Sequence, residues 1–343
     1  MKRVPALAVI GLFAFTTASH AQQVQLVKHP DEKKIDVKIG GKLFTSFLYP
    51  DSLEKPVLFP VHASNGTMVT RGFPLVPQAG DPTDHPHHLG IWFNFENVNG
   101  LDFWNNSYAI PAAKKSHYGW IRTTGDPETK DGSEGELTYR ANWTNQQKEV
   151  LLKETTTLRF SGSRGMRIID RETVLTAQTD VLFKDAKDGM LGFRMAHALQ
   201  IPELKDKEFK DEKGITTIIK GKADSVANGT YLTSEGMKGN DAWGTRGAWC
   251  KLYGKMDKDS IAVIIFDHPK NINYPAWWHA RGYGLFAVNP IGGSIFTKGQ
   301  INTDTALKPG EKLVFRYRIL ITDGAATPDV KAITRIAKNF TKN

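Results

Sequence analysis

The residues with the clearest capacity for chemistry are three histidines within four positions, in the stretch DHPHHLGIWFNF from Asp84 to Phe95. Histidine titrates close to neutral pH, so neighbouring rings can serve as proton donor and proton acceptor in one reaction. We therefore predict that His85, His87 and His88 are catalytic. Partners from elsewhere in the chain must complete the site.

Metal binding is an alternative for the same segment. Zinc and similar metals favour imidazole ligands, and residues two apart on an extended strand point to the same side. His85 and His87 are therefore the candidate ligands of a divalent metal, provided that Pro86 keeps the backbone extended. No His-Glu-x-x-His motif or cysteine cluster supports a metal, and the sequence requires no cofactor. A structural role, in which one or two of the rings hold the loop by hydrogen bonds, is the other alternative.

The segment around these histidines, residues 70–104, combines Pro, Gly, Asp and Asn with six Trp and Phe residues. A plain surface loop would be polar throughout, and a plain strand would not contain Pro86. The composition predicts a long ordered loop that leads into a strand and carries function. Within it we predict that Arg71, Asp102 and Trp104 bind substrate.

A second polar and aromatic group lies late in the chain, in FDHPKNINYPAWWHARGYGLFAVNP and in the earlier GNDAWGTRGAWCKLYG. Aromatic faces stack on the apolar face of a sugar ring, while Arg, Asn and His bond its hydroxyls. We predict that His279 joins the catalytic histidines. The predicted substrate-binding residues of these segments are Arg246, His268, Trp278 and Arg281. The alternative is that the tryptophans fill a core and Arg281 pairs with a surface carboxylate.

Two further residues are ambiguous. His197, in GMLGFRMAHALQ, shares a face with Leu191 and Phe193 if that stretch is a strand. We expect a core or cavity-wall histidine there, which contacts substrate only if this face lines the same pocket. Cys250 is the only cysteine, so the chain has no internal disulfide, and we expect a buried, inert thiol.

The first residues predict export. Lys2 and Arg3 precede an apolar stretch, and Ser19-His20-Ala21 offers the small residues that a signal peptidase accepts. We expect residues 1–21 to be a cleaved signal peptide, which makes the protein periplasmic or secreted without a stable membrane anchor. Removing Lys2 and Arg3 lowers the formal net charge from +9 to +7. The charge is evenly spread, which favours solubility or an acidic small substrate over nucleic acid.

The elements that must position these residues are mostly strands. Apolar residues alternate with polar ones over residues 35–39, 137–143 and 313–321, and Gly40-Gly41 predicts a two-residue hairpin turn. At least ten such runs predict an all-β fold, a large antiparallel β-sandwich, in one domain over residues 24–343. One C-terminal helix is expected, capped by Thr327, with Pro328 in its first turn and an apolar stripe for docking on the sandwich.

The segments DHPHHLGIWF, VNGLDFW, AWGTRGAWCKLYG and FDHPKNINYPAWWHARGYGLFAVNP, with the closing LKPGEKLVFRYRILITDG, resemble the PmoA-like family of bacterial proteins. The resemblance covers nearly the whole mature chain. It implies an exported β-rich protein of sugar catabolism, with a fold similar to the galactose-mutarotase-like supersandwich. The old family label of methane oxygenase names a subunit built from transmembrane helices, which this chain lacks. The resemblance supplies no catalytic residues.

These observations favour an exported carbohydrate-active enzyme that cleaves or isomerises a glycoside or an oxidised sugar by histidine-mediated acid–base chemistry. Its partner would be a small carbohydrate, and the sequence leaves the oligomeric state open. Two alternatives remain at this point. One is a non-catalytic carbohydrate-binding protein that uses the same aromatic and arginine groups. The other is a metal-dependent oxygenase or hydrolase.

Overall fold

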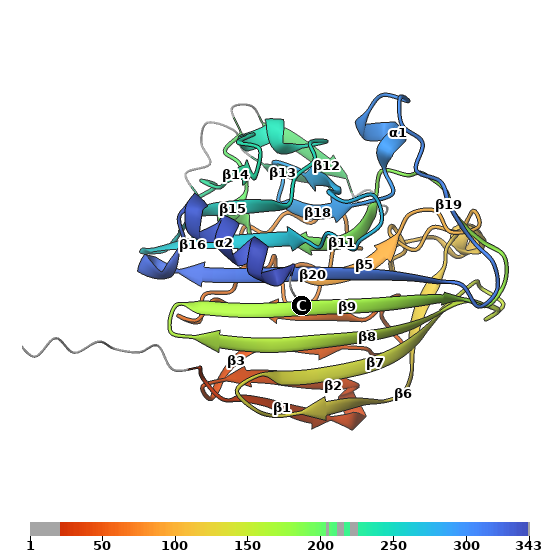
Figure 1. The fold of residues 1–343 in the computed structure, drawn as a ribbon, viewed down its shortest axis with the longest axis horizontal. Helices are drawn as coiled ribbons and strands as arrows, with labels where there is room; N and C mark the ends of the chain where they lie inside the picture. The colour runs from red at the N-terminus through yellow and green to blue at the C-terminus, as the bar shows by residue number, and fades with distance from the viewer. Residues whose placement is uncertain (1–20, 204–205, 211–215, 220–225, 342–343) are drawn as a thin grey trace, which may run out of the picture.

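The computed structural model describes residues 21–203, 206–210, 216–219 and 226–341. Within these residues the chain forms two eight-stranded sheets, whose strand pairs are antiparallel and whose inner faces enclose the core (Figure 1). The predicted all-β sandwich is confirmed. The expected signal peptide, apart from Ala21, lies outside the described residues.

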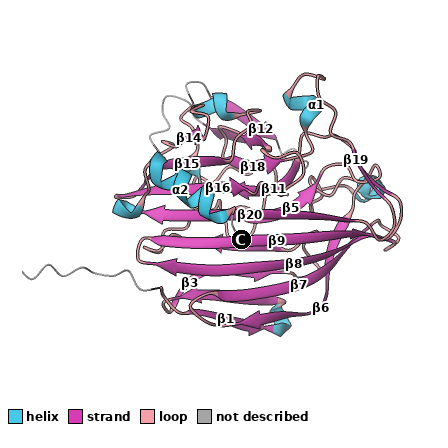
Figure 2. Cartoon of the chain, viewed as in Figure 1, coloured by secondary structure: helices cyan, strands magenta, loops and turns pink. Residues whose placement is uncertain are grey.

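The elements are mostly strands with a few short helices (Figure 2). The first sheet contains, in spatial order, β1 (Val24–His29), β2 (Lys34–Ile39), β3 (Lys42–Leu48), β4 (Val57–Val61), β5 (Ile91–Phe95), β11 (Gly189–Arg194), β18 (Leu285–Asn289) and β17 (Trp277–Ala280). The second contains β14 (Thr230–Thr233), β15 (Trp249–Met256), β16 (Asp259–Asp267), β20 (Lys312–Asp323), β9 (Met166–Ala177), β8 (Val150–Ser163), β7 (Gly135–Thr144) and β6 (Trp120–Lys130).

Two small sheets pair β10 (Val181–Phe183) with β19 (Thr305–Leu307) and β12 (Lys207–Lys210) with β13 (Thr216–Ile219). The α-helices are α1 (Gly293–Phe296) and α2 (Val330–Phe340). The 3-10 turns are η1 (Pro30–Glu32), η2 (Ala112–His117), η3 (His197–Leu199), η4 (Gly239–Ala242) and η5 (Gly324–Ala326). No helix among the described residues is long and apolar enough to cross a membrane.

The hydrophobic alternation of the sequence is realised in the strands. Successive residues of β9 switch between buried and half-buried positions along its whole length, because strand side chains point to opposite faces in turn. Gly40 and Gly41 both have positive φ and connect β2 to β3, as the predicted hairpin requires. Cys250 is buried in β15, and burial raises the pKa of its thiol, in agreement with an inert residue.

The C-terminal helix starts later than the sequence suggested. Its N-cap is Asp329, whose side chain accepts a hydrogen bond from the Ala332 amide at 2.7 Å, rather than Thr327. A carboxylate accepts this bond and also complements the positive end of the helix. Ile333 and Phe340 are buried against the outer face of the second sheet, where Figure 1 shows α2 lying across β16 and β20.

The expected strand over GMLGFRMAHALQ is shorter than predicted. β11 ends at Arg194, and His197 begins the turn η3. Strand periodicity therefore does not extend to His197, and His197 does not lie on the sheet face that Leu191 and Phe193 share. The same strand end places Arg194 on the outer face of the first sheet, opposite the core.

A polar network is buried inside the sandwich. Glu154 accepts hydrogen bonds from Tyr139, Trp143 and Thr156 at 2.7, 2.8 and 2.6 Å, and its Oε1 lies 3.0 Å from Nη2 of Arg171. The Arg171 guanidinium lies 4.6 Å from the ring centre of Phe93, on the first sheet. Each carboxylate oxygen is thus compensated, and the network joins the two sheets.

Glu154→Ala should lower the free energy of unfolding by about 3–5 kcal/mol, because it leaves the Arg171 cation buried without its partner. Urea denaturation followed by circular dichroism measures the change. The matched control is Arg140→Gln, which breaks the exposed ion pair with Glu128 and should cost about 0–1 kcal/mol. Equal effects of the two substitutions would contradict a structural role of the buried network.

Candidate active site

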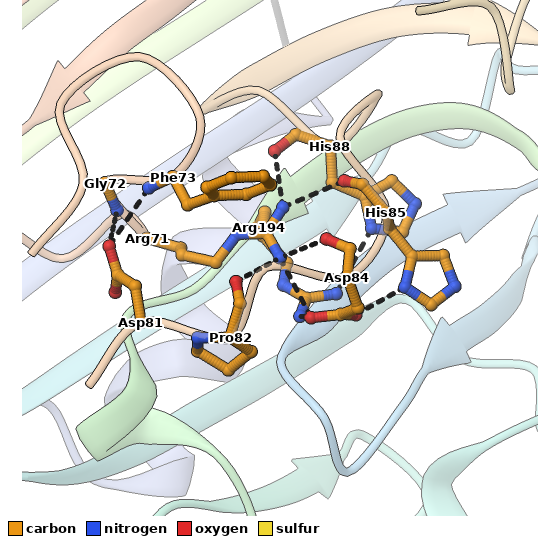
Figure 3. Close-up of polar contacts among 9 residues, drawn as sticks. All are labelled: Arg71, Gly72, Phe73, Asp81, Pro82, Asp84, His85, His88 and Arg194. Carbon is orange, nitrogen blue, oxygen red and sulfur yellow. Dashed lines mark hydrogen bonds and ion pairs between the residues drawn. The ribbon is translucent and has the colours of Figure 1, made fainter. Parts of the chain in front are cut away.

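The loop before β5 is folded around the guanidinium of Arg71 (Figure 3). Its Nη1 donates to the carbonyl oxygens of Pro82 and Asp84 at 3.1 and 2.6 Å. Its Nη2 donates to those of His85 and His88 at 2.9 and 3.3 Å. One side chain that bonds four carbonyls fixes the path of the loop. Arg71, which was expected to bind substrate, therefore positions the histidine segment through these four bonds.

Asp84 is buried between two arginines. Arg194 Nη2 donates to both carboxylate oxygens of Asp84, at 2.8 and 2.9 Å, and Arg71 Nη1 lies 3.1 Å from Oδ1. His85 Nδ1 bonds Oδ2 of the same carboxylate. Burial alone would raise the pKa of Asp84, but Arg194, the bond from His85 and Arg71 together hold it well below its usual value. Asp84 is therefore ionised at neutral pH.

Four rings form a column above the first sheet. Tyr283 stacks on His85 with ring centres 5.1 Å apart and planes 4° apart, and His85 stacks on His88 at 4.8 Å and 4°. His88 stacks in turn on Trp92 of β5, at 5.0 Å and 18°. The side chain of His85 is 35% exposed, whereas His88 is buried. His85 is thus the histidine of this column that solvent or a ligand can reach.

The hydrogen bonds assign the protons of the two stacked imidazoles. Arg194 Nη1 lies 3.2 Å from His88 Nδ1, and arginine only donates, so the proton of neutral His88 resides on Nε2. His85 donates from Nδ1 to ionised Asp84, which leaves the lone pair on its Nε2. Burial lowers the pKa of both imidazoles, most strongly at His88.

His87 lies at the edge of this column. Its ring centre is 4.3 Å from that of His88 and 5.5 Å from that of His85, nearly perpendicular to both. It is buried, and neither ring nitrogen has a hydrogen-bond partner among the described residues. Burial, followed by the charges of His85 and Lys55, lowers its pKa far below the usual value, so His87 is neutral.

The late segment reaches the same face of the first sheet. Trp92 of β5 pairs with Gly192 of β11, Gly192 with Ala287 of β18, and Ala287 with His279 of β17. Side chains in one such cross-strand row share a face, so His279 lies on the outer face with Trp92. The indoles of Trp92 and Trp104 lie directly over Gly192, where a Cβ would stand 2.4 Å from an atom of Trp92.

His279 is paired with a carboxyl group. Its Nε2 lies 3.6 Å from Oδ1 of Asp188, the residue before β11. Burial raises the pKa of Asp188 to about 7, an effect that Lys187 opposes and Glu96 reinforces. Burial likewise lowers the pKa of His279 to about 3. A neutral imidazole beside a carboxyl that is half protonated at pH 7 can exchange a proton with a ligand.

The early and late groups interact electrostatically. The charge of His85 is one of the causes that lower the pKa of His279, and the charge of Asp188 raises that of Tyr283. The structure therefore brings His85, His88 and His279 to one face of the molecule, although they come from distant parts of the sequence.

The geometry does not favour the metal alternative. The backbone at His85 is left-handed, with φ of 48°, and the His88 amide donates to the His85 carbonyl at 3.0 Å. The segment is therefore a turn rather than the extended strand on which the predicted pair of ligands depended. Among the described residues, no three His, Cys, Asp or Glu side chains are arranged to hold a metal ion.

Two predicted substrate-binding residues lie elsewhere, and a third is tied to the backbone. Trp278 precedes His279 in β17 and therefore points to the opposite face, into the sandwich core. The ring of His268 packs on Phe340 of α2, at 5.1 Å, on the outer side of the second sheet. Arg246 donates to the backbone carbonyls of Pro275 and Asn273, at 2.7 and 2.8 Å, so its guanidinium is bound to the loop before β17.

The remaining predicted residues surround the site. Trp104 is buried against Trp92, with ring centres 5.0 Å apart. Asp102 accepts two bonds from Asn105, and burial raises its pKa to about 6. His197 lies beside the histidine loop, with its Nδ1 3.9 Å from where a Cβ of Gly80 would stand. The guanidinium of Arg281 lies near the rings of Trp243 and Tyr283.

Several residues of the site were not predicted. Arg194 had a usable signal, because it is the one charged residue of the apolar strand β11. Asp84 was visible as the first residue of the histidine segment. Lys55, which donates to the Trp104 carbonyl at 3.2 Å and whose pKa burial lowers to about 8, gave no local signal. Asp188 and Tyr283 gave none either.

Buried polar atoms without partners are concentrated at this site. In native proteins nearly all buried polar groups are hydrogen-bonded, so a concentration of exceptions indicates a place where bound polar groups complete the pattern. Within the described part of the chain, the unpartnered atoms at this face are both ring nitrogens of His87, Nε1 of Trp92, Oδ1 of Asn94, Nδ1 of His279, Nε1 of Trp243, and Nε of Arg71 and of Arg194.

Comparison with known families identifies the chain. The model of DUF6807, a family of unknown function, matches residues 34–335, so the chain belongs to that family. The expected membership in a family of unknown function is confirmed, while the PmoA-like name is not part of the description of the matching family. No curated protein matches the chain.

Solved structures to which the chain shows similarity include a galactose mutarotase-like protein from Clostridium acetobutylicum, with 12% identity and a TM-score of 0.37 over 87% of this chain and 98% of that one. A putative aldose 1-epimerase from Klebsiella pneumoniae has 11% identity and a TM-score of 0.33, covering 90% and 83%. The Slr1438 protein from Synechocystis has 8% identity and a TM-score of 0.26, covering 91% and 99%. Similarities at these TM-scores carry no argument about what this chain binds.

Asp84→Asn should lower the free energy of unfolding at pH 7 by about 3–5 kcal/mol, because two buried guanidinium groups lose their shared anion. The folded-state pKa of Asp84 lies below its usual 3.8, so its stabilisation is present above pH 3.8 and is lost as the pH falls through the folded-state value. Urea denaturation at pH 7 measures the deficit. An unchanged midpoint would show that Asp84 does not hold the two arginines.

Proposed function

We propose that this member of the DUF6807 family is a carbohydrate-active enzyme that cleaves or isomerises a glycoside or an oxidised sugar by acid–base catalysis. The observation that carries the proposal is the presence, on one sheet face, of a histidine oriented by a buried carboxylate and of a buried carboxyl whose pKa is about 7. The first is His85 with Asp84, and the second is Asp188 beside His279.

His85 has the features of a general base. Asp84 fixes its tautomer and its ring plane, so the lone pair of Nε2 has a defined direction. Its lowered pKa keeps the ring neutral at pH 7, and the partial exposure of its side chain lets a substrate hydroxyl approach. His88, whose Nε2 carries a proton, supports this base by stacking and offers a donor rather than a second base.

Asp188 has the features of a general acid. A carboxyl with a pKa of about 7 is protonated in about half of the molecules at neutral pH and transfers its proton readily. His279, held neutral by burial, orients the carboxyl across their 3.6 Å contact. Acid–base enzymes use such a pair, an acid and a base whose pKa values are shifted by different surroundings.

The surroundings of this pair suit a sugar. Tyr283 and Trp243, which are half-buried, supply aromatic surface for the C–H faces of a pyranose, and the unpartnered indole and imidazole nitrogens supply donors and acceptors for hydroxyls. We further propose that the enzyme is exported, as the N-terminal sequence predicts, and acts on sugars outside the cytoplasm.

His85→Gln and Asp188→Asn should each lower kcat by about 10²–10⁴-fold, because each removes a proton-transferring group but keeps the shape of the side chain. Proton NMR measures anomer exchange and bond cleavage in a panel of aldoses, uronic acids and their glycosides. His268→Gln is the matched control and should retain wild-type turnover, since His268 lies by α2.

The panel also decides between the alternatives. If the wild-type protein accelerates no reaction in the panel, the enzymatic proposal fails. Tight calorimetric binding of an intact glycan without product would instead support the non-catalytic binding protein.

The pH profile of kcat/KM should be bell-shaped. Activity rises as His85 loses its proton, below its usual pKa of 6.5, and falls as Asp188 loses its proton near pH 7. Asp188→Asn should abolish the alkaline fall of the residual activity and leave the acid limb in place. An alkaline limb that persists in this variant would exclude Asp188 as the acid.

A further inference from the structure

Arg281 is held in an unusual way beside the candidate active site. Its guanidinium carbon lies 5.4 Å from the ring centre of Trp243 and 5.8 Å from that of Tyr283, so the side chain lies between two aromatic rings. The backbone at this point is fixed as well, because the Arg281 amide donates to the Leu285 carbonyl and the Tyr231 hydroxyl donates to the Arg281 carbonyl. The position of the guanidinium is thus determined by its surroundings.

No described residue forms an ion pair or a hydrogen bond with this guanidinium. The contrast with Arg246 is informative. Arg246 also stacks on an indole, that of Trp277 at 4.6 Å, but its Nε and Nη2 donate to backbone carbonyls of the loop it supports. Arg246 therefore has a structural explanation, while the donors of half-buried Arg281 are available to a ligand.

The position of Arg281 links the two halves of the site. Tyr283 stacks on His85, and Trp243 lies edge-on to His279 with ring centres 6.4 Å apart. One ring therefore separates the guanidinium from His85 on one side, and one ring separates it from His279, the partner of Asp188, on the other. Its charge is one of the causes that lower the pKa of His279.

The fixed charges around Arg281 favour an anion. Arg71 and Arg194 share the single carboxylate of Asp84, which leaves one positive charge in excess. Asp188 lies 3.4 Å from Lys187, so this nearby carboxylate already has a cation as partner. The other acidic groups of this region are Glu96 and Asp102, whose charges act on Asp188, and Glu203, whose Oε1 lies 3.6 Å from where a Cβ of Gly282 would stand.

We infer that the site takes an acidic sugar, whose carboxylate or phosphate group binds the guanidinium of Arg281. A planar guanidinium offers two parallel N–H donors, which match the oxygens of either group. The formal net charge of +9 for the whole chain acts in the same direction. This inference rests on the proposed function for the location of the site, and it narrows the substrate class.

Isothermal titration calorimetry tests the inference with matched pairs of probes. The pairs are glucuronate and glucose, galacturonate and galactose, mannuronate and mannose, and glucose 6-phosphate and glucose. At least one acid should bind about tenfold or more tightly than its neutral partner, since a hydrogen-bonded charge pair is strong enough for that difference. The acid that binds identifies carboxylate or phosphate as the recognised group.

Arg281→Gln should reduce the affinity for that acid to the level of its neutral partner and leave the neutral affinity within about twofold. Arg140→Gln, at an exposed arginine paired with Glu128, is the control and should change neither affinity. Binding should also alter tryptophan fluorescence in the wild-type protein, because Trp243 lies against the guanidinium. Equal binding of acids and neutral sugars, binding of none of the acids, or an Arg281→Gln variant with unchanged preference overturns the inference.

The outcome is separable from that of the proposed function. The titrations are repeated with Asp188→Asn, so binding is measured without turnover. Acid binding that depends on Arg281, without catalysis by the wild type, keeps the inference and overturns the enzyme. Catalysis on neutral sugars without preference for acids keeps the enzymatic proposal and overturns the inference about Arg281.

Discussion

The buried carboxylate of Asp84 is the contact on which the site depends. It lies between the guanidinium groups of Arg71 and Arg194 and orients the imidazole of His85. Two arginines of like charge would repel each other in the low dielectric of the interior without this anion. One carboxylate therefore serves two purposes, because it makes the burial of both arginines possible and sets the proton position of the exposed histidine.

The sandwich supplies the rigid support for this arrangement. The inner face of the first sheet belongs to the core, so its outer face is available for chemistry. There, the absence of a Cβ at Gly192 and the small methyl group of Ala287 in the adjacent strand leave space over the sheet, which the indoles of Trp92 and Trp104 occupy. The histidine column stands on these indoles, and the loops before β5 and after β17 meet above it.

The strands could be predicted because alternation is a local property. The β2–β3 hairpin with its Gly40-Gly41 turn and the long strand β20 follow directly from the sequence pattern. The ends of elements were less predictable, since a few hydrogen bonds decide them. Asp329 rather than Thr327 caps α2, and β11 stops at Arg194, three residues before His197.

The site could be predicted only in part. The histidine cluster and the late His279 were visible as unusual residue types in unusual density, and they do share a face. The side on which a strand residue points depends on register, which is why Trp278 and His279 could not be told apart. Lys55, Asp188 and Tyr283 come from unremarkable sequence and acquire their properties through burial, a tertiary effect that local pattern does not encode.

The contacts that hold the histidine loop also separate it from the loop that precedes it. Arg71 donates hydrogen bonds to carbonyls from Pro82 onward. In the preceding loop, residues 72–81, the Asp81 carboxylate accepts hydrogen bonds from the amides of Gly72, Phe73 and Gln78. The loop of residues 72–81 is thus closed by its own hydrogen bonds, and both of its ends are fixed. A change of length or sequence within this loop therefore leaves the backbone that carries the imidazoles in place.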